Sequence, residues 1–326
     1  MPDIGDIEAI KIRRPFGMST TGGSGFPVGR VLECPRKAAL TLLGVRMKRL
    51  GAPLWFGTLI HENAFRPYTE PEEVKDLAAE TEKDIRNAAE SEKMIRTETA
   101  PDGTETEFVQ DLEVSDEDRE KLPKIAKLQM EVWDNERYAQ SEIEAVEQKA
   151  RSDLVDPDSG KVEGIADGVR VAGRMDLLLV RDENEQVPVR DLKTAKAALK
   201  QEWFLNLGYY RQLSTYRYLL AAGAGEMTDN VACFQLTKHM TKESIQKYAG
   251  EIHIRPMPYR RVYDEFMLAW ERLLECERHK YWPMNPTACE GKYGPCMFLP
   301  LCWAEEFDDS DEWKKTLRIR EEMSHG

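Results

Sequence analysis

Two aspartates and a lysine occupy neighbouring predicted strands, where they could hold a metal ion beside a phosphate. Asp176 lies in the β-rich segment 169–180, and Asp191 and Lys193 lie in the segment 186–193. Residues two apart on a strand project from the same face, and a turn between the segments pairs them as a hairpin. Carboxylate oxygens suit Mg²⁺ or Mn²⁺, which would activate a bound water. Lys193 would position that water or stabilise the transition state.

Further groups could join this site. The backbone carbonyl of Leu192 lies between the two strand residues, and His61, on a predicted helix, is a reasonable ligand for Mn²⁺. Gln212 and Tyr216 are four residues apart on another predicted helix and therefore share a face, from which they could hold DNA phosphate or orient a ligand. Each group also has a structural alternative. Asp191 and Lys193 could form a surface salt bridge, His61 could be a structural residue, and Gln212 and Tyr216 could be ordinary helix surface.

Four cysteines have the softness that iron or zinc prefers, and the spacing of the last three is C-x6-C-x5-C. They are Cys34, Cys289, Cys296 and Cys302. The spacing lacks the C-x2-C pairs of structural zinc sites, and prolines and glycines nearby predict turns that could wrap an inorganic core. The alternative is a set of unrelated thiols. Cys233 and Cys276 fit that alternative as small buried hydrophobic residues.

Composition is that of an ordinary soluble chain, with 326 residues, 41% hydrophobic residues and a net charge of −13. Residues 70–125 carry eight Lys/Arg and nineteen Asp/Glu, a balance of −11, whereas residues 1–69 carry ten and five, a balance of +5. We therefore expect an acidic helical insertion at 70–125. Binding to DNA requires a local basic path rather than a basic total. No apolar run is long enough to span a membrane, and without a signal peptide the expected location is cytoplasmic.

Hydrophobic periodicity predicts an α/β core with helical additions. Strands are expected at 143–149, 169–180, 186–193 and 231–237, and helices at 31–44, 54–65, 121–140, 197–222 and 258–280. Residues 1–26 are expected to be irregular, residues 281–304 to form a cysteine segment that packs with Cys34, and residues 305–326 to form an acidic tail. The whole chain, 1–326, is expected to be a single domain.

Taken in order, these pieces resemble RecB-type PD-(D/E)XK nucleases that carry an iron–sulfur cluster, which include CRISPR-associated exonucleases, phage-encoded relatives and the nuclease domain of AddB. The matching pieces are E-C-P-R-K at Cys34, G-T-L-I-H at His61, G-R-M-D at Asp176, D-L-K at Asp191–Lys193, Q-L-S-T-Y at Gln212–Tyr216 and the three late cysteines. Two departures are an aspartate at position 191, where many relatives have glutamate, and the wider cysteine spacing.

The resemblance implies a restriction-endonuclease-like core, a central mixed sheet flanked by helices, and a 4Fe–4S cluster that staples the terminal region. It also implies an exonuclease that prefers single-stranded DNA ends, with Mg²⁺ or Mn²⁺ at His61, Asp176 and Asp191. Roles in DNA recombination, repair or replication, or in CRISPR-type spacer processing with protein partners, follow from the same resemblance. The alternatives are a DNA-binding assembly factor of a recombination or integration complex, and a nuclease stapled by zinc.

Overall fold

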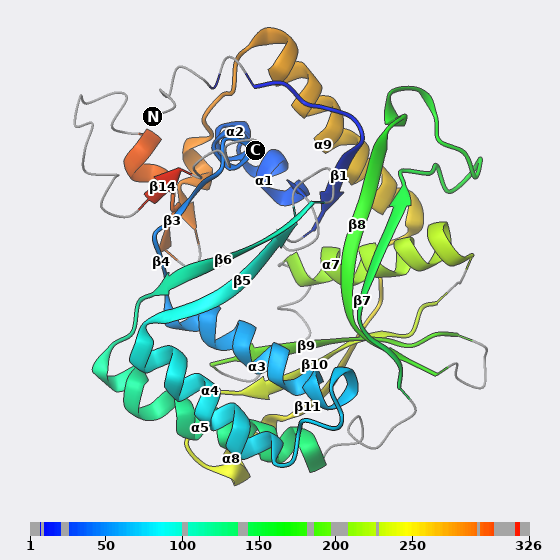
Figure 1. Ribbon diagram of the computed structural model, residues 1–326. Coiled ribbons are helices and arrows are strands. Elements are labelled where there is room, and N and C mark those ends of the chain that lie inside the picture. Colours follow the sequence, from blue (N-terminus) through cyan, green and yellow to red (C-terminus); the bar gives the residue numbers. More distant parts are fainter. Residues whose placement is uncertain are drawn as a thin grey trace.

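The computed structural model describes residues 7, 10–20, 26–99, 104–135, 143–180, 186–196, 208–225, 228–291, 294–302 and 317–319. In this part of the chain, a seven-stranded mixed sheet is flanked by helices (Figure 1), as the expected α/β core requires. The strand order is β11-β10-β9-β8-β1-β2, and β7 also pairs with β8. The strands are β1 (Phe16–Ser19), β2 (Phe26–Pro27), β7 (Ile143–Asp153), β8 (Val169–Leu179), β9 (Val189–Ala195), β10 (Val231–Thr237) and β11 (Gly250–Ile254).

The strands expected to carry the candidate site are confirmed. β8 and β9 pair antiparallel, as expected for segments 169–180 and 186–193. β7 pairs antiparallel with β8 and extends the strand expected at 143–149, while β10 runs parallel to β9. β9 therefore lies in the interior of the sheet, between β8 and β10, and holds Asp191 on a rigid element.

The expectation that residues 1–26 are irregular is wrong for β1 and β2. β1 runs parallel to β8, with Phe16 opposite Val169 and Met18 opposite Val171. All four residues of β1 are buried. A strand covered on both faces lacks the polar alternation of a half-exposed strand, and the neighbouring Gly- and Ser-rich sequence hides so short an element.

Helices cover both faces of the sheet. They are α1 (Val28–Glu33), α2 (Pro35–Leu42), α3 (Ala52–Thr69), α4 (Leu77–Ser91), α5 (Asp116–Asn135), α7 (Gly208–Leu219), α8 (Lys242–Tyr248) and α9 (Tyr259–His279). Short turns of 3-10 helix span Gly164–Ala166 and Pro286–Ala288, and a π-helical turn, Leu220–Ala224, extends α7. The helices expected at 31–44, 54–65 and 258–280 correspond to α2, α3 and α9. Residues 136–140 and 197–207 of two further expected helices lie outside the described residues.

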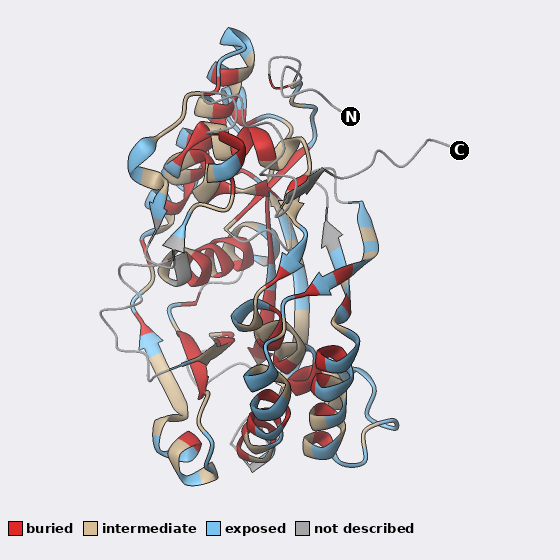
Figure 2. Ribbon diagram, turned by 90° about the vertical axis from the view of Figure 1, so that its left-hand side faces the viewer, coloured by how far each residue is buried: buried red, intermediate tan, exposed pale blue. Residues whose placement is uncertain are grey.

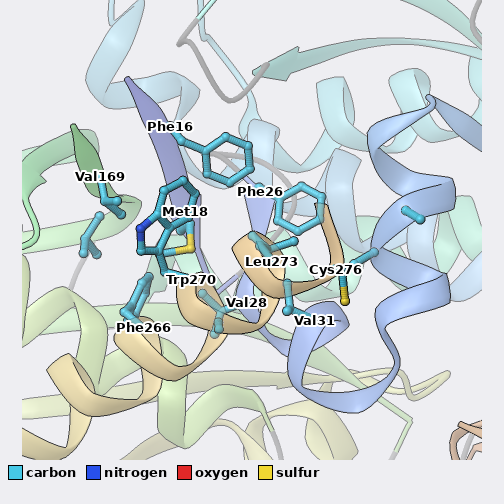
Figure 3. Packing of buried hydrophobic residues seen from close by; sticks show 14 of the residues in the cluster. Phe16, Met18, Phe26, Val28, Val31, Val169, Phe266, Trp270, Leu273 and Cys276 are labelled. Atoms are coloured by element: carbon cyan, nitrogen blue, oxygen red, sulfur yellow. The ribbon is translucent and has the colours of Figure 1, made fainter. Parts of the chain in front are cut away.

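One hydrophobic core joins the two ends of the chain. Trp270 and Phe266 of α9 lie among Phe16 and Met18 of β1 and Val31 of α1, all of them buried (Figure 3). The Trp270 ring lies 5.5 Å from that of Phe16. Because α9 and α1 are more than 200 residues apart, this core ties the C-terminal helix to the N-terminal segment.

A second core anchors α3 beneath the sheet. Trp133 of α5 lies between Phe65 of α3 and Phe234 of β10, with ring centroids 6.0 and 5.4 Å away. Its Nε1 donates a hydrogen bond to the carbonyl of Ala64 at 3.0 Å. In Figure 2, the helices in the lower part of the molecule carry both buried and exposed residues. This packing fixes the helix that carries His61 against the strands of the site.

The acidic segment 70–125 is not purely helical, which corrects the expectation. A β-hairpin, β5 (Lys93–Thr99) and β6 (Glu105–Leu112), separates α4 from α5, and β6 also pairs with β4 (Arg49–Leu50). Lys93, Glu107 and Asp111 of the hairpin alternate with Met94, Phe108 and Leu112, which gives a strand period of two. The high density of Glu and Asp disguises that period in the sequence.

Small strands complete the described chain. They are β3 (Val45–Met47), β12 (Glu290–Gly291), β13 (Gly294–Pro295) and β14 (Leu317–Ile319). β14 pairs with β3, and the rest of the expected tail, 305–316 and 320–326, lies outside the described residues. Among the described helices, none has the length and apolar character needed to cross a membrane.

Candidate functional site

The structure brings together the polar residues that the sequence singled out on α3, β8, β9 and α7. His61 Nε2 lies 2.6 Å from Asp176 Oδ2, and the same oxygen accepts a hydrogen bond from the backbone N–H of Leu192 at 2.7 Å. Lys193 Nζ lies 2.5 Å from Asp191 Oδ2. Both aspartates are buried. Residues 115 positions apart thus meet at one point of the sheet.

The α7 residues reach the same point. Gln212 Nε2 donates to Asp191 Oδ1 at 3.2 Å and lies 2.5 Å from the hydroxyl of Tyr216. The close approach of α7 depends on Gly173 of β8, because a Cβ there would lie 2.8 Å from Leu219 Cδ1 and 3.1 Å from Tyr216 Cε1. The glycine of the G-R-M-D segment therefore makes room for the tyrosine ring.

Burial and mutual charge set the ionisation of the site. Burial and the neighbouring Asp176 together raise the pKa of Asp191 to about 7, against the opposing effect of Lys193. Burial also acts to raise the pKa of Asp176, but His61 and Lys193 outweigh it, and that pKa is lowered. Burial acts to lower the pKa of His61, yet attraction to Asp176 raises it to about 10.

This donor set fits a hard divalent cation. Two carboxylates share a buried space, and the pKa of Asp191 stays raised although Lys193 and His61 act to lower it, because ionising both acids requires more positive charge. The His61 imidazolium and the Lys193 ammonium supply part of that charge here. A divalent cation held by the two carboxylates and the neutral imidazole would supply it instead, with the oxygen and nitrogen ligands that Mg²⁺ or Mn²⁺ accept.

A glutamate that no motif marked completes the set. Glu147 Oε1 lies 3.2 Å from His61 Nδ1, and its Oε2 lies 2.8 Å from Nε of Arg174. Glu147 belongs to β7 at the position opposite Asp176, between the pairs Val146–Leu177 and Gln148–Met175. In the described part of the chain, His61, Glu147 and Asp176 form a group whose ligand atoms all lie within 4.8 Å of one another.

The backbone of Glu147 is in the left-handed region, with φ of 50°. For a residue with a Cβ this conformation costs roughly 1–2 kcal/mol. The strained backbone coincides with the ion pair to Arg174 and the contact to His61. Strain of this kind is found where a side chain must be aimed at a functional group. The weak alternation of β7 gave the only sequence signal, and it does not single out this residue.

The thiols of the cysteine segment lie near Cys34, which precedes α2. The backbone N–H of Asn285 donates to Cys34 Sγ at 3.4 Å, and Cys289 Sγ lies 3.7 Å from the Asn285 carbonyl. Burial raises the pKa of Cys302 to about 11; Arg36 opposes this, and the thiols of Cys296, Cys34 and Cys289 add to it. The four thiols therefore lie close enough to one another to interact electrostatically. Cys233 and Cys276 are buried elsewhere, in β10 and α9.

Comparison with protein families agrees with this geometry. A model of the PD-(D/E)XK nuclease superfamily matches residues 28–303, which include the candidate site and all four clustered cysteines. A search of curated proteins found no significant match. Nucleases of this superfamily use divalent metals, which suits the carboxylates gathered around His61. The match covers most of the sequence, and the chain belongs to the PD-(D/E)XK nuclease superfamily.

Proposed function

We propose that this chain is a metal-dependent DNA exonuclease, folded as a single nuclease domain, that hydrolyses phosphodiester bonds at single-stranded ends. Membership of the superfamily indicates a nuclease and DNA as its substrate. The observation that carries the proposal is the meeting of His61, Asp176, Asp191 and Lys193 from three separate elements. The preference for single-stranded ends, and protein partners in recombination or CRISPR adaptation, rest on the resemblance described above.

Each residue has a distinct role in the proposed reaction. Asp176, Asp191 and neutral His61 would hold Mg²⁺ or Mn²⁺, with the Leu192 carbonyl as a further ligand. The ion would supply a water of lowered pKa and charge stabilisation at the phosphate. Lys193, held beside Asp191 at 2.5 Å, would position that water and stabilise the developing negative charge. Gln212 orients Asp191 through their 3.2 Å contact, and Tyr216 fixes the amide of Gln212.

Degradation of single strands labelled at the 5′ or 3′ end tests this proposal. Asp176→Ala and Asp191→Ala should each abolish Mn²⁺-dependent cleavage, and EDTA should stop the wild type. Lys193→Ala should be inactive but still bind Mn²⁺, because the lysine is not a ligand. Asp153→Ala, at the exposed end of β7, is the matched control and should cleave normally. Cleavage that survives Asp191→Ala or EDTA would show that the reaction occurs elsewhere.

We also propose that Cys34, Cys289, Cys296 and Cys302 hold a structural 4Fe–4S cluster. The support is the shared neighbourhood of the four thiols, which joins the start of α2 to the segment after α9. Purified protein should then be yellow-brown, with broad absorption near roughly 400 nm. Cys34→Ala should remove the colour and Cys233→Ala should not. Colourless protein with one zinc and no iron would favour a zinc staple instead.

A further inference from the structure

A row of basic and aromatic side chains leads along the β5–β6 hairpin toward the candidate site. Arg96 of β5 and Phe108 of β6 are direct cross-strand partners and therefore share a face of the hairpin. The guanidinium carbon of Arg46, from β3, lies 5.5 Å from the centroid of the Phe108 ring. Arg46, Phe108 and Arg96 thus form a continuous row across three strands.

The row lies on the inner face of the hairpin. Its neighbours in the same alternation, Met94, Gln110 and Leu112, are buried, whereas Arg96 and Phe108 are half-buried. The opposite face carries Ile95 and Val109, which are direct partners with 65% and 54% of their surface exposed. The two faces of one hairpin therefore differ, and only the inner face presents the row.

The inner face adjoins the candidate metal site. Arg96 acts electrostatically on Glu62, which follows His61 in α3 and which also interacts with Arg174 and Glu147. Glu105, on the outer face of the same strand as Phe108, pairs with Lys149 of β7 at 2.6 Å, two residues from Glu147. The hairpin therefore extends from α4 and α5, at one end, to β7, a strand of the site, at the other (Figure 1).

We propose that the inner face of the β5–β6 hairpin binds a single DNA strand and directs it to the candidate metal site, with Phe108 stacking on a base and Arg46 and Arg96 contacting phosphates. This inference rests on the proposed function. Unpaired bases expose a π-face to an aromatic ring, and arginine binds both phosphate and aromatic planes. Arg96 of the row belongs to the segment 70–125, whose net charge is −11, and Arg46 adds a second positive charge from β3, so the row is a local basic path beside acidic sequence. The adjoining metal site favours a nucleic-acid occupant.

Binding measured without cleavage separates this surface from the chemistry. A fluorescent single-stranded oligodeoxythymidylate would be titrated with full-length protein in EDTA, and anisotropy recorded at several salt concentrations. Phe108→Ala should weaken binding about 5- to 150-fold, the loss expected for one stacked base. Arg96→Gln should reduce the salt slope by about 0.7, the value for one phosphate contact on a single strand.

Matched variants guard against a folding defect. Phe108→Tyr keeps the ring and should keep wild-type affinity. Lys93→Gln removes a charge, and Val109→Ala an apolar side chain, from the outer face of the same hairpin, and both should bind as the wild type does. Thermal unfolding of each variant identifies any change that acts through stability.

Each outcome decides between the two proposals. The hairpin proposal would be overturned if the inner-face variants bound single strands as tightly as wild type does. If wild type still cleaved DNA with Mn²⁺, the nuclease function would stand. The proposal would also be overturned if the outer-face variants lost as much affinity as the inner-face variants. The same holds if Phe108→Ala weakened binding of blunt duplex as much as binding of single strands, because neither result fits base stacking on the inner face. Wild type that binds single strands through this row but releases no nucleotides with Mn²⁺ would support the surface and refute the nuclease function.

Discussion

Substitutions of Glu147 should have opposite effects on metal affinity and on the free energy of unfolding. Its carboxylate lies 3.2 Å from His61 Nδ1 and is held at 2.8 Å by Arg174, so it favours the form of the imidazole that carries a proton on Nδ1. When His61 gives up the proton that Nε2 shares with Asp176, that form would offer the Nε2 lone pair to a metal. At the same time the residue holds φ of 50°. One side chain therefore both supports a ligand and strains the backbone.

The two effects have opposite signs and comparable sizes. Loss of a carboxylate that orients a ligating histidine typically weakens metal binding by 10- to 100-fold, or about 1.4–2.7 kcal/mol. Glycine adopts positive φ without a steric penalty, which removes about 1–2 kcal/mol of strain, partly offset by the greater freedom of glycine in the unfolded chain. We therefore expect Glu147→Gly to be about 1 kcal/mol more stable than Glu147→Ala, since both lose the same carboxylate contacts.

Two measurements test these effects. Mn²⁺ titration by calorimetry should show 10- to 100-fold weaker binding for Glu147→Gln, while Glu144→Gln, an exposed residue of the same strand, should bind as wild type. Urea unfolding of metal-free protein should place the Gly variant above the Ala variant. Unchanged Mn²⁺ affinity in Glu147→Gln would refute the orienting role, and a Gly variant less stable than the Ala variant would refute the strain.

Two further predictions concern packing and buried charge. Gly173→Ala should lower the free energy of unfolding by about 1–3 kcal/mol, because its Cβ would overlap Leu219 and Tyr216, whereas Gly223→Ala, with open space around it, should not; urea unfolding measures both. Lys238→Met should raise the unfolding free energy by about 1–3 kcal/mol at pH 7, because burial lowers the pKa of Lys238 from 10.5 to about 8. That gain should shrink toward pH 10, as measured by urea unfolding at both pH values.

The sign of the pH effect follows from proton counts. Between pH 8 and 10.5 the unfolded chain holds a proton on Lys238 that the folded chain has lost, so the wild type gains stability as pH rises. The ring of Phe56, 4.5 Å from Nζ, partly compensates the charged form and keeps the effect below its upper bound. If the gain in unfolding free energy of Lys238→Met were the same at both pH values, it would come from packing rather than from charge. An unaltered Gly173→Ala variant would show that α7 can retreat from β8 freely.

The part of the site that the sequence predicted is the part encoded by local patterns. Asp191 and Lys193 lie two apart on a strand, and the segment carrying Asp176 pairs with that strand across a short connection, so strand periodicity is enough to bring them together. Gln212 and Tyr216 share a helix face for the equivalent reason. The contact of Gln212 with Asp191 is tertiary, and helix periodicity offers it only as one alternative beside ordinary helix surface.

The missed elements have sequences in which tertiary burial or charge hides the local pattern. β1 has both faces covered, so Phe16 and Met18 lack alternating polar neighbours. In the β5–β6 hairpin, charge hides the strand pattern instead. One face is solvated and acidic, while Met94 and Leu112 are buried in the core with residues of α3 and α4. Propensity that favours helix in a glutamate-rich segment is overridden there by cross-strand pairing and burial.

Glu147 shows why a motif alone could not complete the site. Its place opposite Asp176 depends on the register of β7 against β8, and fifteen residues, 154–168, separate those strands in the sequence. A one-residue slip would turn the carboxylate to the other face of the sheet. The positive φ then aims the side chain at His61, a residue that arrives from a different helix. Three independent structural conditions therefore set one contact, and none of them leaves a residue pattern that could be recognised beforehand. The same reasoning makes Glu147 a sharper test of the site than the motif aspartates, because its predicted effects follow from the geometry alone.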